Sequence, residues 1–371
     1  MSGGTARLSR FLLALGALAW VLACTPAASP AGAPTAAPGG DSAAVGAARG
    51  PAGAAADAAP AAPSAPPPAP EKLKIIYSSL AGNYMPLWIA VDAGLFREQG
   101  LDPELLLIES GTAATQALVA GESPLANVGA AAVLGAMVEG FDGVFVQAVV
   151  QVPPLAIFSR DAVATPEDLR GGRLAVTRFG SSTDVVGRIL LRGWGLEPER
   201  DVAVLQMGSV SEQLAALERG AADAAVLSDP TSLRAAKLGY RQLVDAAELG
   251  IPYMHLGTVV PRGVLAARPD LVRRYILGYQ AGLERFFADP ALAKQVLRQY
   301  VRLDDPELLD ASYQAYATKY FHHDTRPRAE ALVPILGALT SERAREVAPE
   351  SLIDDRIIRQ LQAEGLVPSD R

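Results

Sequence analysis

The sequence predicts an α/β protein made of two lobes. From about residue 71 onward, short apolar runs bounded by turn residues alternate with longer amphipathic stretches. That alternation is typical of parallel sheets covered by helices on both faces. Two segments roughly a hundred residues apart are also similar to each other, which suggests two lobes of the same construction. A body of about 300 residues is long enough to bury two such cores.

The first 23 residues predict an export signal. Arg7 and Arg10 precede an apolar run from Phe11 to Ala23 that ends in small residues. This run is too short for a bilayer, which needs roughly 20 apolar residues, but it suits the core of a signal peptide. The last three residues, Leu22-Ala23-Cys24, resemble the lipobox of bacterial lipoproteins, in which the cysteine becomes the first mature residue and carries the lipid. The alternative is an ordinary signal peptide with an incidental cysteine.

Residues 24–71 predict a lipidated cysteine followed by a disordered tether. The stretch after Cys24 is almost wholly Ala, Pro, Gly and Ser, so it has few large side chains to bury against the entropy of ordering. Cys24 is the only cysteine of the 371 residues, and a single cysteine cannot form a disulfide within the chain. We therefore expect the exported body to be held together by its core.

The charge balance is acidic. The chain has 33 Lys and Arg against 40 Asp and Glu, a net charge of −7. This balance disfavours a nucleic-acid partner or direct binding to an anionic membrane surface. We expect membrane association only through the N-terminal lipid.

The body contains seven short runs that predict strands, separated by amphipathic stretches that predict helices. The predicted strands are 73–79, 104–109, 125–128, 144–150, 173–177, 202–206 and 223–227. The clearest predicted helices between them are 112–120, 181–192 and 209–219. The similar segments are GTAATQALVAGESPLANVG, from Gly111 to Gly129, and GSVSEQLAALERGAADAAV, from Gly208 to Val226. Each opens a helix with Gly and a hydroxyl residue and then leads into a strand of small residues.

After Pro261 the pattern predicts helices only. Residues 269–288 carry large apolar side chains at helical spacing, which indicates core packing, and further helices are expected near 290–302, 306–321 and 327–340. We expect this helical segment to pack on the lobe that begins the chain. The pair His322-His323 favours a helix end, where histidines interact with the helix dipole, and we expect no metal site.

Three stretches resemble the periplasmic binding proteins for nitrate, sulfonates, taurine and thiamine-pyrimidine precursors. They are PLWIAVDAGLFREQGLDPEL (86–105), RFGSSTDVVGRILLRGWGL (178–196) and DVAVLQMGSVSEQLAALERGAADAAVLSDP (201–230). The resemblance implies a type II binding protein whose two lobes close on a ligand about a hinge. Lobe 1 would comprise residues 72–157 and 258–371, and lobe 2 residues 158–257. It further implies a monomer that feeds an ABC permease with its ATPase, without cofactor or chemistry.

In open α/β sheets ligands bind beyond the carboxyl ends of the strands. This rule indicates five loops: 78–84, 110–112, 128–130, 179–183 and 228–230. The loop FGSST is the most informative, because a glycine followed by hydroxyl residues at a helix start offers free amides to an anionic or strongly accepting group. Plain helix capping is the alternative. The predicted ligand-binding residues are Ser79, Asn83, Tyr84, Thr112, Gly129, Phe179, Gly180, Ser181, Ser182, Thr183 and Asp229.

The predicted site leaves the charge of the ligand open. Arg178, beside the FGSST loop, is the nearby cation that a sulfonate or nitrate would need, but it equally suits a solvent-facing position. Asp229 stands where the family usually has glutamate before proline, and a carboxylate there would accept hydrogen bonds from an amine. Few cations together with Asp229 slightly favour a neutral or amine-bearing organic ligand.

Two other function classes remain open. An extracytoplasmic sensor or interaction lipoprotein would have the same sequence features. An enzyme similar to the eukaryotic pyrimidine-precursor synthases is less favoured, since those rely on a cysteine-rich motif and the only cysteine here is assigned to the anchor. Residue His255 lies in a segment, 254–259, that we expect to cross between the lobes, where a structural role is favoured over a place in the cleft.

Overall fold

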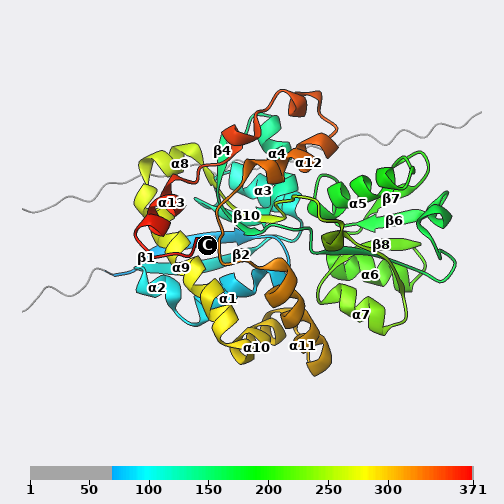
Figure 1. Ribbon diagram of the computed structural model, residues 1–371, viewed down its shortest axis with the longest axis horizontal. Coiled ribbons are helices and arrows are strands. Elements are labelled where there is room, and N and C mark those ends of the chain that lie inside the picture. Colours follow the sequence, from blue (N-terminus) through cyan, green and yellow to red (C-terminus); the bar gives the residue numbers. More distant parts are fainter. Residues whose placement is uncertain (1–68, 370–371) are drawn as a thin grey trace, which may run out of the picture. The chain divides into compact units, whose positions relative to one another are not determined.

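The computed structural model describes residues 69–369 (Figure 1). The predicted signal segment, Cys24 and nearly all of the predicted tether lie outside these residues. The first strand, β1, begins at Glu71, where the Ala- and Pro-rich composition gives way to the alternating run EKLKIIY.

The first sheet has the strand order β2-β1-β3-β10-β4. Its strands are β1 (Glu71–Tyr77), β2 (Leu101–Leu107), β3 (Ala126–Gly129), β4 (Gly143–Val150) and β10 (Leu256–Pro261). Strands β2 and β3 both run parallel to β1, whereas β10 is antiparallel to β3 and β4. All eight residues of β4 are buried, as expected for a strand covered on both faces.

The second sheet repeats this topology in the order β7-β6-β8-β5-β9. Its strands are β5 (Leu155–Ser159), β6 (Arg173–Val176), β7 (Ala203–Gln206), β8 (Ala224–Ser228) and β9 (Arg241–Asp245). Here β7 and β8 are parallel to β6, and β5 is antiparallel to β8 and β9. The two similar sequence segments therefore occupy the same place in the two sheets: each supplies a helix and the strand that follows it.

The sheets are mixed: the expectation of parallel strands holds for β1, β2 and β3 and for β6, β7 and β8, whereas β5 and β10 are antiparallel to their neighbours. The sequence patterns missed three strands, β5, β9 and β10. Of these, β5 and β10 each follow a crossing from one sheet to the other. Because parallel strands end at the edge that faces the other lobe, a strand that enters from that edge must run the opposite way. Leu256, the first residue of β10, accordingly pairs with Gly129, the last residue of β3.

Helices cover both sheets. Those of the first are α1 (Met85–Asp92), α2 (Leu95–Glu98), α3 (Gly111–Val119) and α4 (Ala130–Val138). Those of the second are α5 (Ser182–Gly193), α6 (Val210–Glu218) and α7 (Thr231–Lys237). A short 3-10 turn, η1 (Gly82–Tyr84), precedes α1. The three helices predicted from the spacing of apolar residues match α3, α5 and α6 within one residue at each end.

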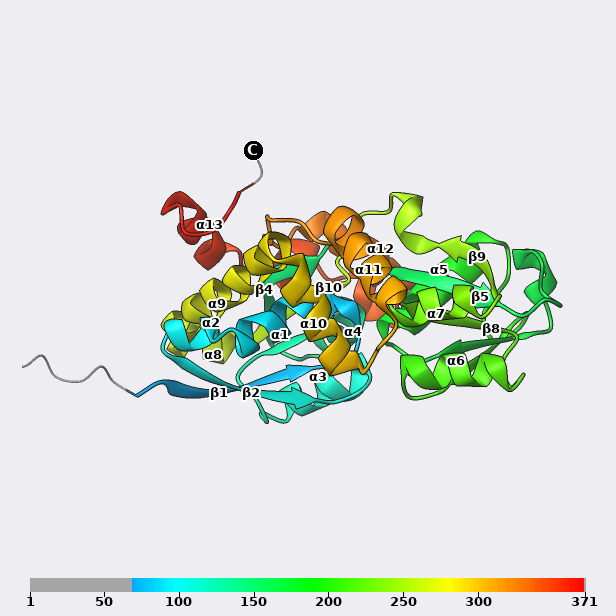
Figure 2. The same ribbon diagram turned by 90° about the horizontal axis from the view of Figure 1, so that it is seen from below.

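The C-terminal helices pack mainly on the first sheet. They are α8 (Arg262–Ala267), α9 (Pro269–Ala288), α10 (Pro290–Val301), α11 (Pro306–Ala315), α12 (Val333–Ala338) and α13 (Arg356–Ala363). In both ribbon views α9 lies along α1 and α2 (Figures 1 and 2). Two glycines permit this close packing, because a Cβ at Gly282 would collide with the carbonyl oxygen of Pro86, and one at Gly278 would meet the ring of Phe96.

The helical segment also contacts the second sheet's helices. Lys237 at the end of α7 forms ion pairs with Asp305 (2.6 Å) and Glu307 (3.0 Å) at the start of α11.

After β4 the chain crosses to β5 within residues 151–154, and it returns to β10 after Gly250. The predicted lobe boundaries at 157/158 and 257/258 fall inside β5 and β10, so sheet membership puts both crossings a few residues earlier. Pro153 and Pro154 explain the first break, because proline lacks the amide that a strand ladder needs.

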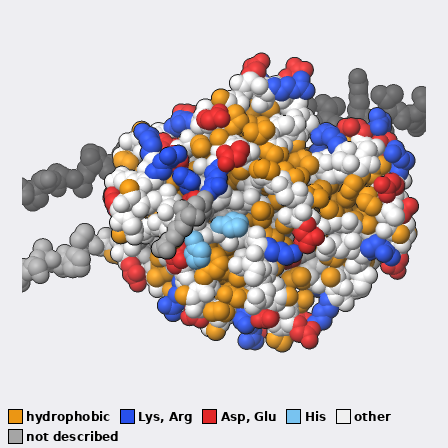
Figure 3. Space-filling view, viewed as in Figure 1, with side chains coloured by type: hydrophobic (Ala, Val, Ile, Leu, Met, Phe, Trp, Pro, Cys, Tyr) orange, Lys and Arg blue, Asp and Glu red, His pale blue; other side chains and the backbone are white. Residues whose placement is uncertain are grey.

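Within residues 69–369, none of the helices combines the length and apolar character needed to cross a membrane. On the face shown in Figure 3, acidic and basic side chains are interspersed among hydrophobic ones.

Candidate functional site

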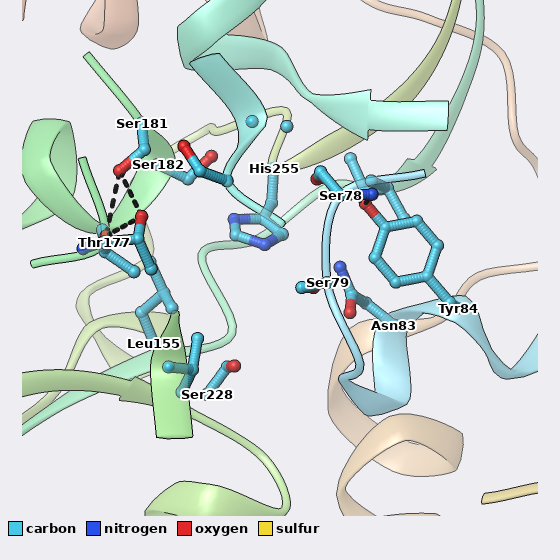
Figure 4. A pocket seen from close by; sticks show the side chains of 16 residues that line it. Ser78, Ser79, Asn83, Tyr84, Leu155, Thr177, Ser181, Ser182, Ser228 and His255 are labelled. Atoms are coloured by element: carbon cyan, nitrogen blue, oxygen red, sulfur yellow. Dashed lines mark hydrogen bonds between the residues drawn. The ribbon is translucent and has the colours of Figure 1, made fainter. Parts of the chain in front are cut away.

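A small cavity of about 60 Å³ lies where the carboxyl ends of the parallel strands of both sheets meet (Figure 4). The first sheet and its loops supply Ser78, Ser79, Asn83, Tyr84, Ser110, Gly111, Gly129, His255 and Leu256. The second sheet and its loops supply Leu155, Thr177, Ser181, Ser182, Thr183, Val210 and Ser228. Each of the five loops indicated by the sequence contributes at least one of these residues. We call this space the cleft cavity.

Four helices from the two sheets begin at the cleft cavity. Gly111 and Ser182 are the first residues of α3 and α5, Gly129 immediately precedes α4, and Val210 opens α6. The first amides of a helix have no acceptor within the helix, and the helix dipole makes this end electropositive. The first amide of α4, at Ala130, donates to the His255 carbonyl oxygen at 3.0 Å, and a Ser209–Glu212 capping box covers the start of α6. The starts of α3 and α5 therefore offer N–H donors to the cavity, whose lining contains no cationic side chain.

The hydroxyl groups of the FGSST loop divide into two kinds. Thr177 Oγ1, Ser181 Oγ and Thr183 Oγ1 lie 2.8–3.0 Å from one another and form a closed hydrogen-bonded cluster. Thr183 Oγ1 also accepts from the Thr177 amide at 2.9 Å. Ser181 and Thr183 therefore hold the loop in place, so for these two residues the structural role given as the alternative applies. Ser182 Oγ has no such partner and faces Gly129 of the first lobe, where a Cβ would collide with it.

Three further buried polar atoms at the cavity find no hydrogen-bond partner among residues 69–369: Asn83 Oδ1, Ser110 Oγ and His255 Nδ1. The three residues are only 5%, 4% and 7% exposed. Buried polar groups are normally hydrogen-bonded, and leaving one unsatisfied costs about 1–3 kcal/mol. Together with Ser182 Oγ they converge on one space from both lobes, as Figure 4 shows for Asn83, His255 and Ser182. This is the arrangement expected of a site that a polar ligand completes.

His255 was not among the predicted binding residues, yet it lies at the centre of the cavity (Figure 4). Burial lowers its pKa to about 3, so the imidazole is neutral at physiological pH. The other lining residues are Ser, Thr, Asn, Tyr, Gly, Leu and Val, and none of them carries a charge at that pH. The position of this side chain depends on the pairing of β10 with β3, which local sequence patterns do not show.

Tyr84 reaches the cavity wall but its hydroxyl is already engaged. It lies 2.8 Å from Ser78 Oγ and donates to the carbonyl oxygen of Asn127 at 3.1 Å. Burial raises the pKa of Tyr84 to about 12. Figure 4 shows this hydroxyl beside Ser78. Tyr84 thus shapes the wall, while its neighbour Asn83 offers a free polar atom.

Seven of the predicted binding residues line the cleft cavity, and four lie outside its lining. The seven are Ser79, Asn83, Tyr84, Gly129, Ser181, Ser182 and Thr183, and the four are Thr112, Phe179, Gly180 and Asp229. Thr112 Oγ1 donates to the carbonyl oxygen of Phe179 at 3.1 Å and so joins the two lobes beside the cavity. The Phe179 ring is 44% exposed and lies beneath the Arg188 guanidinium.

The Asp229 carboxylate faces a different space, a cavity of about 210 Å³ that Asp245, Lys319 and Tyr320 also line. Its side chain accepts a hydrogen bond from the Ser232 hydroxyl in α7, and its backbone oxygen accepts from the Gly82 amide at 3.1 Å. Burial raises the pKa of this carboxyl to about 6. Arg178 is exposed and also lies outside the cleft lining. The two charged residues that the sequence suggested for the site, Asp229 and Arg178, therefore both lie outside the wall of the cleft cavity.

Two α/β lobes of identical topology, with a polar cavity at the facing strand ends, define the fold of the periplasmic binding proteins. Solved structures with this fold include a protein of Bordetella bronchiseptica RB50, which has 20% sequence identity and a TM-score of 0.71, with 79% of this chain and 98% of that one covered. The alkanesulfonate-binding protein SsuA of Xanthomonas axonopodis pv. citri, bound to MOPS, has 21% identity and a TM-score of 0.62, with 81% and 96% covered. The nitrate-binding protein NrtA of Synechocystis PCC 6803 has 14% identity and a TM-score of 0.66, with 82% and 93% covered.

The sequence itself places the chain in a family. Residues 81–293 match the family model described as NMT1/THI5 like, and the chain belongs to that family. No curated protein sequence matches the chain.

Proposed function

We propose that this protein is an extracytoplasmic substrate-binding lipoprotein that captures a small solute between its two lobes for an ABC importer. The observation that carries the proposal is the cleft cavity, in which unpaired buried polar side-chain atoms from both lobes, and the starts of α3 and α5, converge on one space. Support also comes from structural relatives whose names describe alkanesulfonate and nitrate binding.

The cavity favours a compact group that accepts several hydrogen bonds, such as a sulfonate, a nitrate or a polar heterocycle. Helix N-termini and hydroxyl groups hold such groups through N–H and O–H donors. An amine is disfavoured in the cleft, since the Asp229 carboxylate that would accept its protons faces another cavity. The proposed ligand contacts are Ser79, Asn83, Ser110, Ser182, His255 and the amides at the starts of α3 and α5. The wall contains no paired nucleophile and base, and we propose that the ligand is released unchanged.

A thermal-shift screen tests the proposed binding, because a ligand that binds only the folded state raises its apparent stability. The compounds are MOPS, taurine, nitrate, pyrimidines and small amines. Gly129→Val places a side chain against Ser182 and closes the cavity, so we expect it to abolish the shift. Gly263→Val is the matched control, because a Cβ at Gly263 meets no atom within 4 Å. A ligand shift that survives in Gly129→Val contradicts the proposed site.

The proposed anchor is tested separately. In cells, the full-length protein should fractionate with the membrane, and the Cys24→Ser variant should be released. If both variants stay with the membrane, lipid attachment at Cys24 is wrong, whatever the outcome of the ligand screen. A direct test of the importer partner is co-purification with a permease encoded beside this protein.

A further inference from the structure

A second and larger cavity, of about 600 Å³, lies between α3 and α4 beside the cleft cavity. One face of each helix lines it, at the spacing of successive helical turns. On α3 these residues are Thr112, Thr115, Gln116 and Val119, and on α4 they are Ala132, Gly135, Ala136 and Glu139. Gly140, Phe141, Leu339 and Gly180 complete the lining. We call this space the helix groove.

The helix groove is hollow because α4 presents small residues to it. A Cβ at Gly135 would meet no atom within 4 Å. Glycine inside a helix costs roughly 1 kcal/mol relative to alanine. The opposite face of α4 is conventional core, with Val133, Leu134, Met137 and Val138 buried. The sequence thus keeps a helix-weakening residue at a place where any side chain would fill the groove.

The helix groove and the cleft cavity share a wall. Gly111 lines the cleft and the next residue, Thr112, lines the groove. In the other lobe Ser181 lines the cleft and Gly180 lines the groove. Across this wall, Thr112 Oγ1 donates to the carbonyl oxygen of Phe179, the residue before Gly180, at 3.1 Å. A ligand group that replaces this contact would pass directly from one space to the other.

The interior of the groove suits an apolar group. The Thr115 hydroxyl is satisfied within its own helix, since it donates to the Gly111 carbonyl oxygen at 2.8 Å. Glu139 lies at the far end, where Ser341 and Arg343 hold its carboxylate. Val119, which is 53% exposed, adds an apolar side chain to the wall. The polar groups are therefore already paired or at the rim, whereas the cleft cavity contains unpaired ones.

We propose that the helix groove holds the apolar part of the same ligand whose polar head occupies the cleft cavity. The inference rests on the proposed function and names its substrate class: amphipathic small molecules with a compact hydrogen-bond-accepting head and an alkyl chain or ring. The two volumes support this division. Ligand sites commonly enclose about 300–1,000 Å³, so a cavity of about 60 Å³ accommodates a head group only, and the groove supplies the remaining space.

The test is a series of n-alkanesulfonates from methane- to hexanesulfonate, titrated calorimetrically against three forms of the protein. In the wild type the Kd should fall about fourfold for each added methylene, as expected for burial of one CH₂ group. Gly135→Leu fills the groove and should bind methanesulfonate within twofold of the wild type while losing the dependence on chain length. Gly193→Leu is the matched control at the end of α5, where a Cβ also meets no atom within 4 Å, and it should behave as the wild type.

The outcomes separate the inference from the proposed function. If short sulfonates bind but added methylenes gain nothing, or if the gain persists in Gly135→Leu, the groove does not hold the tail and the proposed function stands. If the groove binds a protein partner and not the tail, short sulfonates should bind but added methylenes should not improve their affinity. If no compound of this series or of the wider screen binds the wild type, the proposed function fails and the inference fails with it.

Discussion

The hydroxyl groups of two adjacent residues in the FGSST loop, Ser182 and Thr183, have different surroundings, which predicts different effects of their substitution. Thr183 Oγ1 accepts from the Thr177 amide and lies 3.0 Å from the hydroxyls of Thr177 and Ser181, in a residue that is only 6% exposed. Thr183→Ala removes all of these contacts. Net hydrogen bonds contribute about 0.5–1.5 kcal/mol each, and an orphaned buried donor costs about 1–3 kcal/mol. Because the contacts form one network, we expect a total loss of about 1–3 kcal/mol in the free energy of unfolding.

Ser182→Ala should behave in the opposite way. Its hydroxyl has no partner among the described residues, so its removal should not lower the free energy of unfolding and should raise it by up to about 1–3 kcal/mol, the cost of an unsatisfied buried group. Loss of one hydrogen bond to the ligand should weaken binding by roughly 2- to 13-fold, which corresponds to about 0.5–1.5 kcal/mol. Urea unfolding of both free variants, followed by calorimetric titration with a ligand from the screen, measures both quantities. A large stability loss in Ser182→Ala, or none in Thr183→Ala, would refute this assignment of roles.

Three further predictions concern pH and packing. Burial lowers the pKa of His255 to about 3, whereas the imidazole of the unfolded chain titrates near 6.5. As the pH falls below 6.5, the unfolded chain therefore takes up a proton that the folded protein does not. The free energy of unfolding should then fall by up to about 1.4 kcal/mol for each pH unit between about 6.5 and 3. His255→Gln should flatten this part of a urea-unfolding profile between pH 3.5 and 7. Burial of Asp229 acts with the opposite sign: the pKa is raised to about 6, so its contribution is favourable below about pH 4 and lost as the pH rises through 6. Asp229→Asn should therefore add about 1–3 kcal/mol at pH 8 and nothing below pH 4. Gly282→Ala should lower the free energy of unfolding by about 1–3 kcal/mol, since the added methyl collides with the Pro86 carbonyl oxygen, whereas Gly263→Ala, with open space around it, should change it by less than about 0.5 kcal/mol.

The sequence was most informative where a pattern is local. The apolar spacing of α9 predicts the side chains that it buries, among them Tyr275, Tyr279 and Phe286. The run LAIFS, which forms β5, is equally apolar and lies after two prolines, so its composition could have identified it as a buried strand. The run LGTVVP, which forms β10, is interrupted by Gly257 and Thr258 and gives a weaker signal. Its place between β3 and β4 depends on pairing with residues more than a hundred positions away.

The same distinction applies to the candidate site. The rule that ligands bind at the carboxyl ends of strands located all five loops, because it depends only on strand order and direction. It could not separate Ser182 from Thr183, since their roles depend on which way each side chain turns within one helical turn. It also could not show that the Asp229 side chain turns toward Ser232, or that crossing back from the second sheet brings His255 into the cavity.

The absence of charge from the cleft lining has a kinetic consequence. A fixed charge acts over about a Debye length, roughly 8 Å at physiological ionic strength, whereas dipoles such as N–H and O–H groups act at contact. A ligand held at the proposed site would be attracted only over the short range of the helix starts, and its capture would lack the long-range acceleration that a cationic side chain gives. Affinity set in this way would depend less on the salt concentration around the protein than affinity set by a cationic side chain, so a change of medium would alter the fraction of occupied molecules less.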